Sequence, residues 1–411
     1  MNFEFFIAKR IIDSKAYKSS VSAPIIKIGI AAIAIGIIVM MIAVATGIGL
    51  QQKIRDKVSA FNGHIIISNF DSNNSQESGR PISTQQDFYP TFTSVEGIKN
   101  VQAVASKFGI IRTETDFEAI IVKGVGADYN WDYFEEFLIE GRLPDYTKER
   151  NQEVLVSEDL AKRMQFDLGD SFTTFFRKED PNALPTPLRY HIVGIYNSGL
   201  KEFDETYVIG DIRHIQRLNK WEANQVGSFE VLLEDYNQLN EKFKEVFQNT
   251  SSLLNTYTVE QKHASIFEWI SIFDKNTYGI IGIMILVAGI NMITALLVLI
   301  LERTKMIGIF KALGSSNWSI RKMFLYNASY IILIGLFWGN LIGISLLLAQ
   351  KYGKLFPLDP SVYHVSEVPV YINIGYIVAL NIGTFILCLL MLLIPSYIIT
   401  KISPVKAIRF E

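Results

Sequence analysis

Four long apolar runs without a charged residue limit what this chain of 411 residues can fold into. They cover residues 28–50, 278–301, 324–349 and 371–400. Each exceeds the roughly 20 residues that a helix needs to cross a hydrocarbon core about 30 Å thick. The composition agrees, since 49% of the residues are hydrophobic and only 19% are charged. We therefore predict four transmembrane helices, at 28–50, 270–301, 324–349 and 371–400.

The first apolar run follows several basic residues, as the core of a secretory signal peptide does. It is longer than such a core, which has about 7 to 15 residues, and no A-x-A-like cleavage site follows it before Lys53. We therefore expect residues 28–50 to remain as an uncleaved helix. Within residues 1–27, Phe6 and Ile7 share a face of a short amphipathic stretch, which predicts a helix lying on the membrane surface.

Lysine and arginine residues are concentrated in three segments that flank the runs, residues 1–27, 302–323 and 401–411. These basic residues are Lys9, Arg10, Lys15, Lys18, Lys27, Arg303, Lys305, Lys311, Arg321, Lys322, Lys401, Lys406 and Arg409. Basic segments of this kind stay in the cytoplasm under the positive-inside rule. We therefore expect both termini to be cytoplasmic, with residues 51–269 and the loop 350–370 on the outer side.

The outer segment, residues 51–269, is long enough to form a domain with its own core. Short apolar or alternating stretches bounded by turn residues predict strands, for example at 64–69 and 171–177. Residues 95–107 and 109–122 together predict a short helix and strands. We therefore expect an α+β domain, joined by a stalk, between the first and second membrane helices. Its excess of carboxylates indicates a solvated acidic surface, with a specific basic partner as the alternative.

The sequence lacks the signatures of several catalytic and cofactor sites. It has no G-x-x-x-x-G-K-[ST] phosphate loop, no H-E-x-x-H pair and no G-x-S-x-G nucleophile elbow. The five histidines are scattered, which favours ordinary surface or core roles over metal ligation. The single cysteine, Cys388, excludes an internal disulfide. We therefore expect no catalytic residue, no metal site, no cofactor bound by this chain and no nucleic-acid partner.

Small and polar residues inside the apolar runs indicate how the helices pack. Gly335, Gly339 and Gly343 recur every four residues, so they share one face and allow a neighbouring helix to approach closely. Helix packing is our preferred interpretation of these glycines, and a lipid groove is the alternative. Amide side chains are costly to expose to lipid, so we expect those in the runs to face the bundle. They are Asn291, Asn340 and Asn381.

Apolar residues near the outer ends of the first two membrane helices form a candidate groove for the acyl chains of a lipid. Methionine is flexible enough to adapt to such chains, and tryptophan is typical of the membrane interface. Packing within the bundle or contact with bulk lipid is the alternative for the same residues. The candidate groove consists of Met40, Met41, Ile42, Ile48, Trp269 and Phe273.

A short basic elbow, residues 302–323, separates the second and third apolar runs. Gly314 supplies the left-handed conformation that ends a helix, and Ser315 or Ser316 can cap the helix that follows. A stiff amphipathic helix of this kind on the membrane surface suits docking to a partner protein. Its apolar residues recur at the spacing of one helix face, with the basic residues facing elsewhere. They are Met306, Ile309, Phe310 and Leu313.

The chain resembles the ABC-transporter permease family that includes the lipoprotein-releasing permeases LolC and LolE, the cell-division permease FtsX and the macrolide exporter MacB. Residues 302–314, E-R-T-K-M-I-G-I-F-K-A-L-G, are similar to the family's E-R-x-x-E-I-G-I-L-K-A-L-G loop. Residues 404–409, P-V-K-A-I-R, are similar to its terminal P-V-E-A-L-R. The early F-I-A-K-R and the stretch S-E-D-L-A-K-R-M-Q-F-D-L-G-D at 157–170 most resemble the lipoprotein-releasing branch.

The resemblance implies a membrane subunit that works with several partners. These are two copies of a separate ABC ATPase, which bind ATP and Mg²⁺, and a second permease, either identical or paralogous. The substrate would be a lipoprotein of the bacterial inner membrane, and a soluble periplasmic carrier would receive it. The implied function is a permease that couples ATP hydrolysis by its partner to lipoprotein release. The alternatives are an FtsX-like signalling permease that controls a cell-wall hydrolase and a MacB-like mechanotransmission exporter.

Two sites transfer from the family by position. The proline-rich loop 178–187 occupies the place of the carrier-binding hairpin of LolC, and its candidate residues are Pro181, Leu184, Pro185 and Pro187. The elbow would be the coupling helix that binds the ATPase. The family has an acidic residue where Met306 stands here. The coupling residues are Glu302, Arg303, Lys305, Met306, Ile307, Gly308, Ile309, Phe310, Lys311, Leu313 and Gly314.

Overall fold

The structure is a computed structural model. It describes residues 4–7, 10, 23–70, 76–113, 116–178, 182–358, 365 and 367–404. Some residues named above lie outside these ranges, namely Lys9, Lys15, Lys18, Pro181, Lys406 and Arg409. The chain divides into two compact units. One comprises Met1–Gln51, Trp269–Pro357 and Glu367–Glu411, and the other comprises Gln52–Glu268 and Leu358–Ser366.

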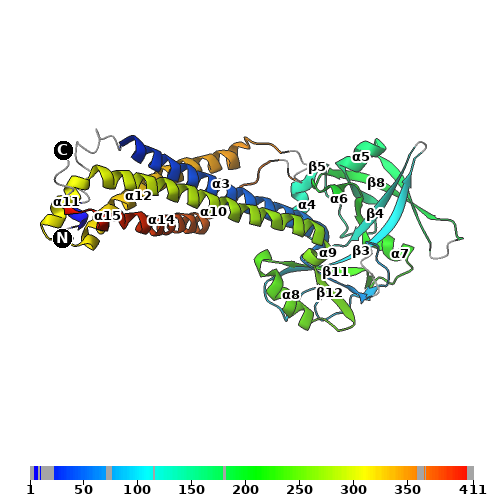
Figure 1. Ribbon diagram of the computed structural model, residues 1–411. Helices are drawn as coiled ribbons and strands as arrows, with labels where there is room; N and C mark the ends of the chain where they lie inside the picture. The colour runs from blue at the N-terminus through cyan, green and yellow to red at the C-terminus, as the bar shows by residue number, and fades with distance from the viewer. Residues whose placement is uncertain are drawn as a thin grey trace. The chain divides into compact units, whose positions relative to one another are not determined.

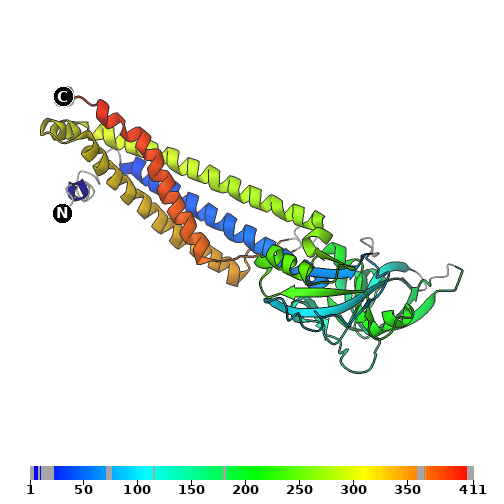
Figure 2. The ribbon, with the colours of Figure 1, turned by 90° about the horizontal axis from the view of Figure 1, so that it is seen from below.

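The first unit is built from long apolar helices that run alongside one another (Figures 1 and 2). They are α3 (Ala23–Asn62), α10 (Ala264–Glu302), α12 (Asn317–Gly353) and α14 (Ile374–Ser396). Each is long and apolar enough to cross a membrane, which confirms the predicted set of spans. Two short helices complete the unit, α11 (Thr304–Ala312) and α15 (Ile398–Lys401).

Helix α12 packs closely against α3 at Gly335, Gly339 and Gly343. A β-carbon built on Gly335 would lie 2.8 Å from the Ile33 side chain, and one built on Gly343 would lie 3.3 Å from Met41. Gly339 is the tightest position, because a β-carbon there would overlap the Ile37 side chain and lie 2.9 Å from the main-chain oxygen of Ala34. The glycine face predicted from the sequence therefore lies against α3.

Replacing Gly339 by alanine is expected to lower the thermal stability of the detergent-solubilised protein. The added methyl group overlaps the backbone of α3, which cannot move as a flexible side chain can, and overpacking of this kind costs about 1–3 kcal/mol. Gly383→Ala in α14 is the matched control, because no atom lies within 4 Å of a β-carbon there. Equal melting temperatures for the two variants would contradict this packing.

Polar groups within the bundle pair with one another. The amides of Asn340 in α12 and Asn381 in α14 exchange hydrogen bonds of 2.7 and 2.9 Å, which confirms that both face the bundle. Asn291 instead donates to the main-chain oxygen of Val287, one turn earlier in α10. Cys388 in α14 is fully buried in the same apolar core.

The second unit is the α+β domain expected between the first two membrane helices. Its main sheet has the strand order β12-β1-β11-β3-β4-β9-β6-β8-β5, and β7 pairs with both β3 and β8. The strands are β1 (Ile65–Asn69), β2 (Ile82–Ser83), β3 (Ile98–Arg112), β4 (Phe117–Val125), β5 (Leu138–Gly141), β6 (Glu153–Ser157), β7 (Ser171–Phe176), β8 (Thr186–Tyr196), β9 (Tyr207–Asp211), β10 (Gln225–Val226), β11 (Ser228–Leu233) and β12 (Leu254–Thr258).

Short helices cover this sheet, and α7 packs on β3 and β4 while α8 packs beside β12 (Figure 1). They are α4 (Asp132–Phe137), α5 (Glu158–Met164), α6 (Lys201–Asp204), α7 (Ile212–Leu218), η2 (Tyr236–Gln238), α8 (Leu239–Gln248) and α9 (Val259–Lys262). Alternate apolar side chains of most strands, including β1, β3, β4, β6, β7 and β11, point into a single core. In β7, for example, Phe172 and Phe176 are buried while Ser171 is exposed.

The prediction of a short helix within residues 95–107 was wrong. The structure has one long strand there, β3, which pairs with β11 over its first half and with β4 over its second half. Both partners come from later in the chain. The hydrogen bonds to these two strands determine the conformation of β3, and they cannot be predicted from the residue pattern of β3 itself.

Candidate functional site

The elbow between α10 and α12 folds into the short helix α11. Gly314 follows this helix with a φ of +88°, a left-handed conformation that glycine adopts without strain. The Ser316 hydroxyl accepts a hydrogen bond of 3.2 Å from the Ser319 N–H at the start of α12. The predicted helix end and the predicted cap are both confirmed.

One side of α11 is fixed to the bundle. Ile307 is fully buried, and Met306 and Phe310 pack against the apolar core. The Lys311 ammonium donates hydrogen bonds of 2.6 to 3.2 Å to three main-chain oxygens at the end of α15. Helix ends leave such oxygens without intrahelical partners, so Lys311 links α11 to α15, the short helix that follows α14.

The other side of the elbow exposes apolar side chains. Ile309 is 52% exposed, Leu313 is 76% exposed, and Trp318 at the start of α12 is 51% exposed. The four-residue stripe predicted from the sequence is therefore divided, with two members facing inward and two facing outward. Ile307, which is not part of that stripe, takes the buried position because α11 lies on the bundle.

The exposed side of the elbow is held in a defined position. The Arg321 guanidinium lies 5.3 Å from the centre of the Trp318 ring and donates a hydrogen bond of 3.0 Å to the Ser396 hydroxyl. Exposed aromatic and aliphatic groups on a rigid support are typical of the centre of a protein interface. Of the other coupling residues, Glu302 and Lys305 are exposed, Arg303 is half-buried and Gly308 is buried.

The candidate groove residues do not form one surface in this chain. Met40 and Met41 are buried in the bundle core, whereas Ile42 and Ile48 are half-buried. A cavity beside Met41 has a volume of only ≈ 10 Å³, about that of one water molecule. Trp269 and Phe273 in α10 pack edge to face with ring centres 4.9 Å apart.

The proline-rich loop joins β7 to β8. Leu184 is 83% exposed and Pro185 is exposed, as expected for a projecting loop. Pro187 instead belongs to β8, where it is paired with Phe175 of β7. A proline can occupy a strand wherever its missing N–H is not needed for the ladder. Pro181 lies outside the described residues.

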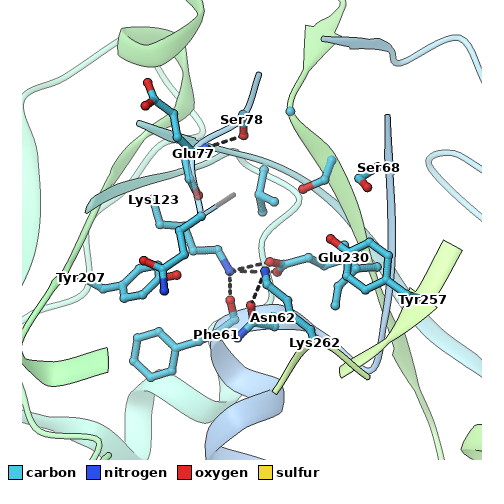
Figure 3. Close-up of a pocket in the computed structure, with 16 residues that line it drawn as sticks. Phe61, Asn62, Ser68, Glu77, Ser78, Lys123, Tyr207, Glu230, Tyr257 and Lys262 are labelled. Carbon is cyan, nitrogen blue, oxygen red and sulfur yellow. Dashed lines mark hydrogen bonds and ion pairs between the residues drawn. The ribbon is translucent and has the colours of Figure 1, made fainter. Parts of the chain in front are cut away.

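A buried polar cluster in the second unit surrounds the last turn of α3 (Figure 3). Lys123 of β4 is 2% exposed, and its ammonium donates to the Glu230 carboxylate of β11 at 2.7 and 2.9 Å. The same ammonium donates to the main-chain oxygen of Phe61. The Tyr129 hydroxyl donates to the oxygen of Ala60 at 2.8 Å. These two donors satisfy carbonyls that the helix end leaves free, so side chains of the domain hold the end of α3.

Lys262 and Gly63 complete this arrangement. The Lys262 ammonium donates to the Asn62 side chain at 2.8 Å, and it points toward Glu230 in Figure 3. Gly63 has a φ of +65°, and a β-carbon there would lie 2.9 Å from the Glu230 side chain, so glycine is required. Burial lowers the pKa of Lys123, and attraction to Glu230 opposes that change. We call this set the α3 clamp. It consists of Lys123, Tyr129, Glu230 and Lys262.

The second unit is expected to lose stability as the pH falls from about 6.5 to 4. His64 is buried, its Nδ1 accepts a hydrogen bond of 2.8 Å from the Leu233 N–H, and burial lowers its pKa to about 4. In the unfolded chain the His64 imidazole binds a proton near pH 6.5. Its contribution to the stability of the folded unit is therefore complete above that pH and decreases below it. The loss reaches about 3 kcal/mol once the pH is below 4. His263, whose pKa burial also lowers to about 4, acts in the same range.

Hydrogen exchange of this unit at pH 7 and pH 5 measures the effect. His64→Gln is expected to remove about half of the pH dependence, because His263 still titrates. His191→Gln, at an exposed position, is expected to leave it unchanged. A pH dependence that is identical in the two variants would contradict the role of His64.

Comparison with known proteins relates both units to described families. Residues 28–246 match the model of the MacB-like periplasmic core domain, and residues 278–404 match that of the FtsX-like permease C-terminal domain. Among curated proteins, the lipoprotein-releasing system transmembrane protein LolC of Buchnera aphidicola subsp. Schizaphis graminum is 23% identical, with 94% of each chain covered. The transmembrane protein LolE of the same kind of system from Haemophilus influenzae is 20% identical, with 99% of each chain covered. Among solved structures, the periplasmic region of MacB from Actinobacillus actinomycetemcomitans has 15% identity and a TM-score of 0.34, and the match covers 50% of this chain and 92% of that one.

Proposed function

The chain belongs to the family of permeases that combine a MacB-like periplasmic core domain with an FtsX-like C-terminal domain, and from this membership we propose that it is the membrane subunit of a lipoprotein-releasing ABC transporter. Its similarity to LolC and LolE over nearly the whole chain supports this choice within the family. The proposed location is the bacterial inner membrane, with both termini and the elbow in the cytoplasm. The proposed substrate is an acylated lipoprotein, which a soluble periplasmic carrier receives.

The exposed apolar side of the elbow carries this proposal. Ile309 and Leu313 project from a helix whose opposite side is fixed by Ile307 and Lys311. In the proposed assembly these two side chains bind a separate ATPase, and ATP and Mg²⁺ bind to that partner rather than to this chain. Two ATPase copies and a second permease complete the transporter.

The proposed mechanism transmits force without chemistry in this chain. Closure of the ATPase moves α11, and the Lys311 hydrogen bonds and the packing of Phe310 pass the movement to the bundle. Helix α3 has 40 residues, about twice the length that crosses a membrane, and the α3 clamp holds its last turn. Movement of α3 would therefore displace the sheet of the second unit, to which the α3 clamp connects it.

The free energy needed to remove acyl chains from the membrane explains why such a transporter needs ATP and a carrier. Each CH₂ group removed from lipid into water costs about 0.8 kcal/mol, so a chain of sixteen carbons costs roughly 12 kcal/mol. A lipoprotein with several chains requires either repeated hydrolysis or a carrier that shelters the chains throughout the transfer. The groove that this chain leaves incomplete would be closed by the second permease.

Reconstitution tests the proposal. Proteoliposomes containing the chain, its partner permease and their ATPase would be loaded with a fluorescent triacylated lipoprotein and supplied with a soluble carrier. We expect ATP to move fluorescence from the membrane pellet to the soluble fraction, and ADP to have no effect. ATP turnover without any release would contradict the proposal and would favour a signalling permease or an exporter of other substrates.

A further inference from the structure

A strongly basic cavity lies at the base of the β7–β8 hairpin. Its volume is ≈ 640 Å³, within the range of about 300–1,000 Å³ that is typical of small-ligand sites. Five exposed cations line it and come from three parts of the domain. Arg150 precedes β6, Arg177 and Lys178 follow β7, and Arg217 and Lys220 lie at the end of α7. We call this space the basic cavity.

The five exposed cations of the basic cavity differ from most other cations of the second unit in their ion pairing. None of the five makes an ion pair with a carboxylate in the part of the chain that the structure describes, and none of the described residues lining the cavity is acidic. Elsewhere in the unit cations are neutralised, for example Lys53 by Glu136 and Lys99 by Asp132, both at 2.8 Å. A cation deeper in the cavity, Lys107, has Glu77 at 3.3 Å.

The end of α7 explains only part of this charge. Basic residues at a helix C-terminus interact favourably with the helix dipole, which accounts for Arg217 and Lys220 as structural residues. It does not account for Arg150, Arg177 and Lys178, which belong to other elements and face the same cavity. Like charges brought together from three segments repel one another, and a bound anion would relieve that repulsion.

Lys220 occupies a position that suits glycine better than lysine. Its φ is +56°, just past the end of α7, where helices usually place glycine in the left-handed conformation. Its N–H bonds to the oxygen of Arg217 at 3.2 Å, as expected for such a helix end. The lysine side chain is therefore held toward the cavity at some conformational cost.

The lining also indicates the chemistry of the ligand. Arginine forks and lysine ammonium groups bind phosphate oxygens well, and five cations exceed what one carboxylate would neutralise. Pro187, Leu188 and Leu218 add an apolar wall. We propose that the basic cavity binds a phosphate-bearing ligand, supplied either by an anionic phospholipid headgroup or by a soluble phosphate ester. This site is independent of the proposed transport function.

Pyrophosphate is the probe for this site. The full-length chain in phosphatidylcholine nanodiscs at low salt is expected to bind it saturably by calorimetry, with about tenfold weaker binding for Arg177→Gln combined with Arg217→Gln. Lys220→Gly is expected to weaken binding while leaving the melting temperature unchanged or higher, because glycine fits a φ of +56°. Lys148→Gln, an exposed lysine outside the cavity, is the control and should bind normally.

Three outcomes would overturn the proposal. The first is a lack of saturable binding at millimolar pyrophosphate, and the second is equal weakening of binding by Lys148→Gln and Lys220→Gly. The third is displacement of the probe by polyglutamate at equal charge concentration, which would show that the cavity binds an acidic protein segment. Two further outcomes support it and distinguish the sources. Weaker probe binding in nanodiscs that contain phosphatidylglycerol identifies a lipid headgroup as the ligand. Equal binding in both kinds of nanodisc identifies a soluble phosphate ester.

Discussion

Leu313→Asp is expected to abolish co-purification of this chain with the proposed ATPase partner. Leu313 is 76% exposed on the outward side of α11, so the substitution leaves the bundle core intact. In the proposed complex the same position is buried, and an unpaired carboxylate there is costly to desolvate. Loss of a central interface residue typically costs 2 kcal/mol or more, which is about a thirtyfold decrease in affinity. Affinity purification of the tagged chain from detergent extracts, with the ATPase quantified by immunoblot, measures the effect.

The control for this experiment is the same substitution at a leucine of similar exposure outside the elbow. Leu253 lies in the second unit and is 79% exposed, and Leu253→Asp is expected to leave ATPase binding unchanged. The free energy of unfolding of each variant should lie within about 0.5 kcal/mol of the parent's, as is usual for substitutions at exposed positions. Normal recovery of the ATPase with the Leu313 variant would refute the assignment of α11 as the coupling helix.

Glu230→Gln is expected to destabilise the second unit by about 3–5 kcal/mol, because it leaves the Lys123 ammonium buried without a counter-charge. For a domain of this size, such a change lowers the melting temperature by roughly 10 °C. The loss should be largest around the last turn of α3, since Lys123 also holds the oxygen of Phe61. Thermal unfolding and hydrogen exchange of the full-length protein in detergent measure the global and the local effect.

Two further variants separate the buried charge from ordinary ion pairing. Lys99→Met breaks an exposed pair with Asp132 and should cost less than about 1 kcal/mol. Adding Lys123→Met to Glu230→Gln removes the uncompensated charge, and Gln102 can still bond to the new amide, so the double variant should be more stable than the single one. A single variant as stable as the parent would show that the clamp does not hold α3.

The spans and the elbow were predictable from the sequence because their signals are local. The length of an uncharged apolar run and its lack of charge can be read directly from the sequence, and a run of more than 20 residues is enough to predict a membrane-spanning helix. Gly314 and Ser316 specify the helix end and the next cap within a few residues. The division of the apolar stripe was not predictable, because it depends on how α11 lies on the bundle and on the contact of Lys311 with the distant end of α15.

The α3 clamp was missed for a related reason. Its central pair joins residues 107 positions apart, and no local periodicity brings Lys123 and Glu230 together. One signal was present, since Lys123 is a charged residue within the apolar strand A-I-I-V-K-G-V and requires a buried partner. The long strand β3 was also missed, because its ladders come from later segments. The groove residues Met40 and Met41 look the same in sequence whether they face a lipid or another helix.

The burial of Cys388 makes this chain, in effect, free of reactive thiols. It is the sole cysteine and lies in the bundle core, so hydrophilic maleimides have no native target to reach. A single cysteine introduced at Leu184 or Leu313, both exposed, would then be labelled without background. With a reagent that does not cross the inner membrane, the proposed orientation requires Leu184→Cys to react in intact cells. Leu313→Cys should react only after the membrane is opened.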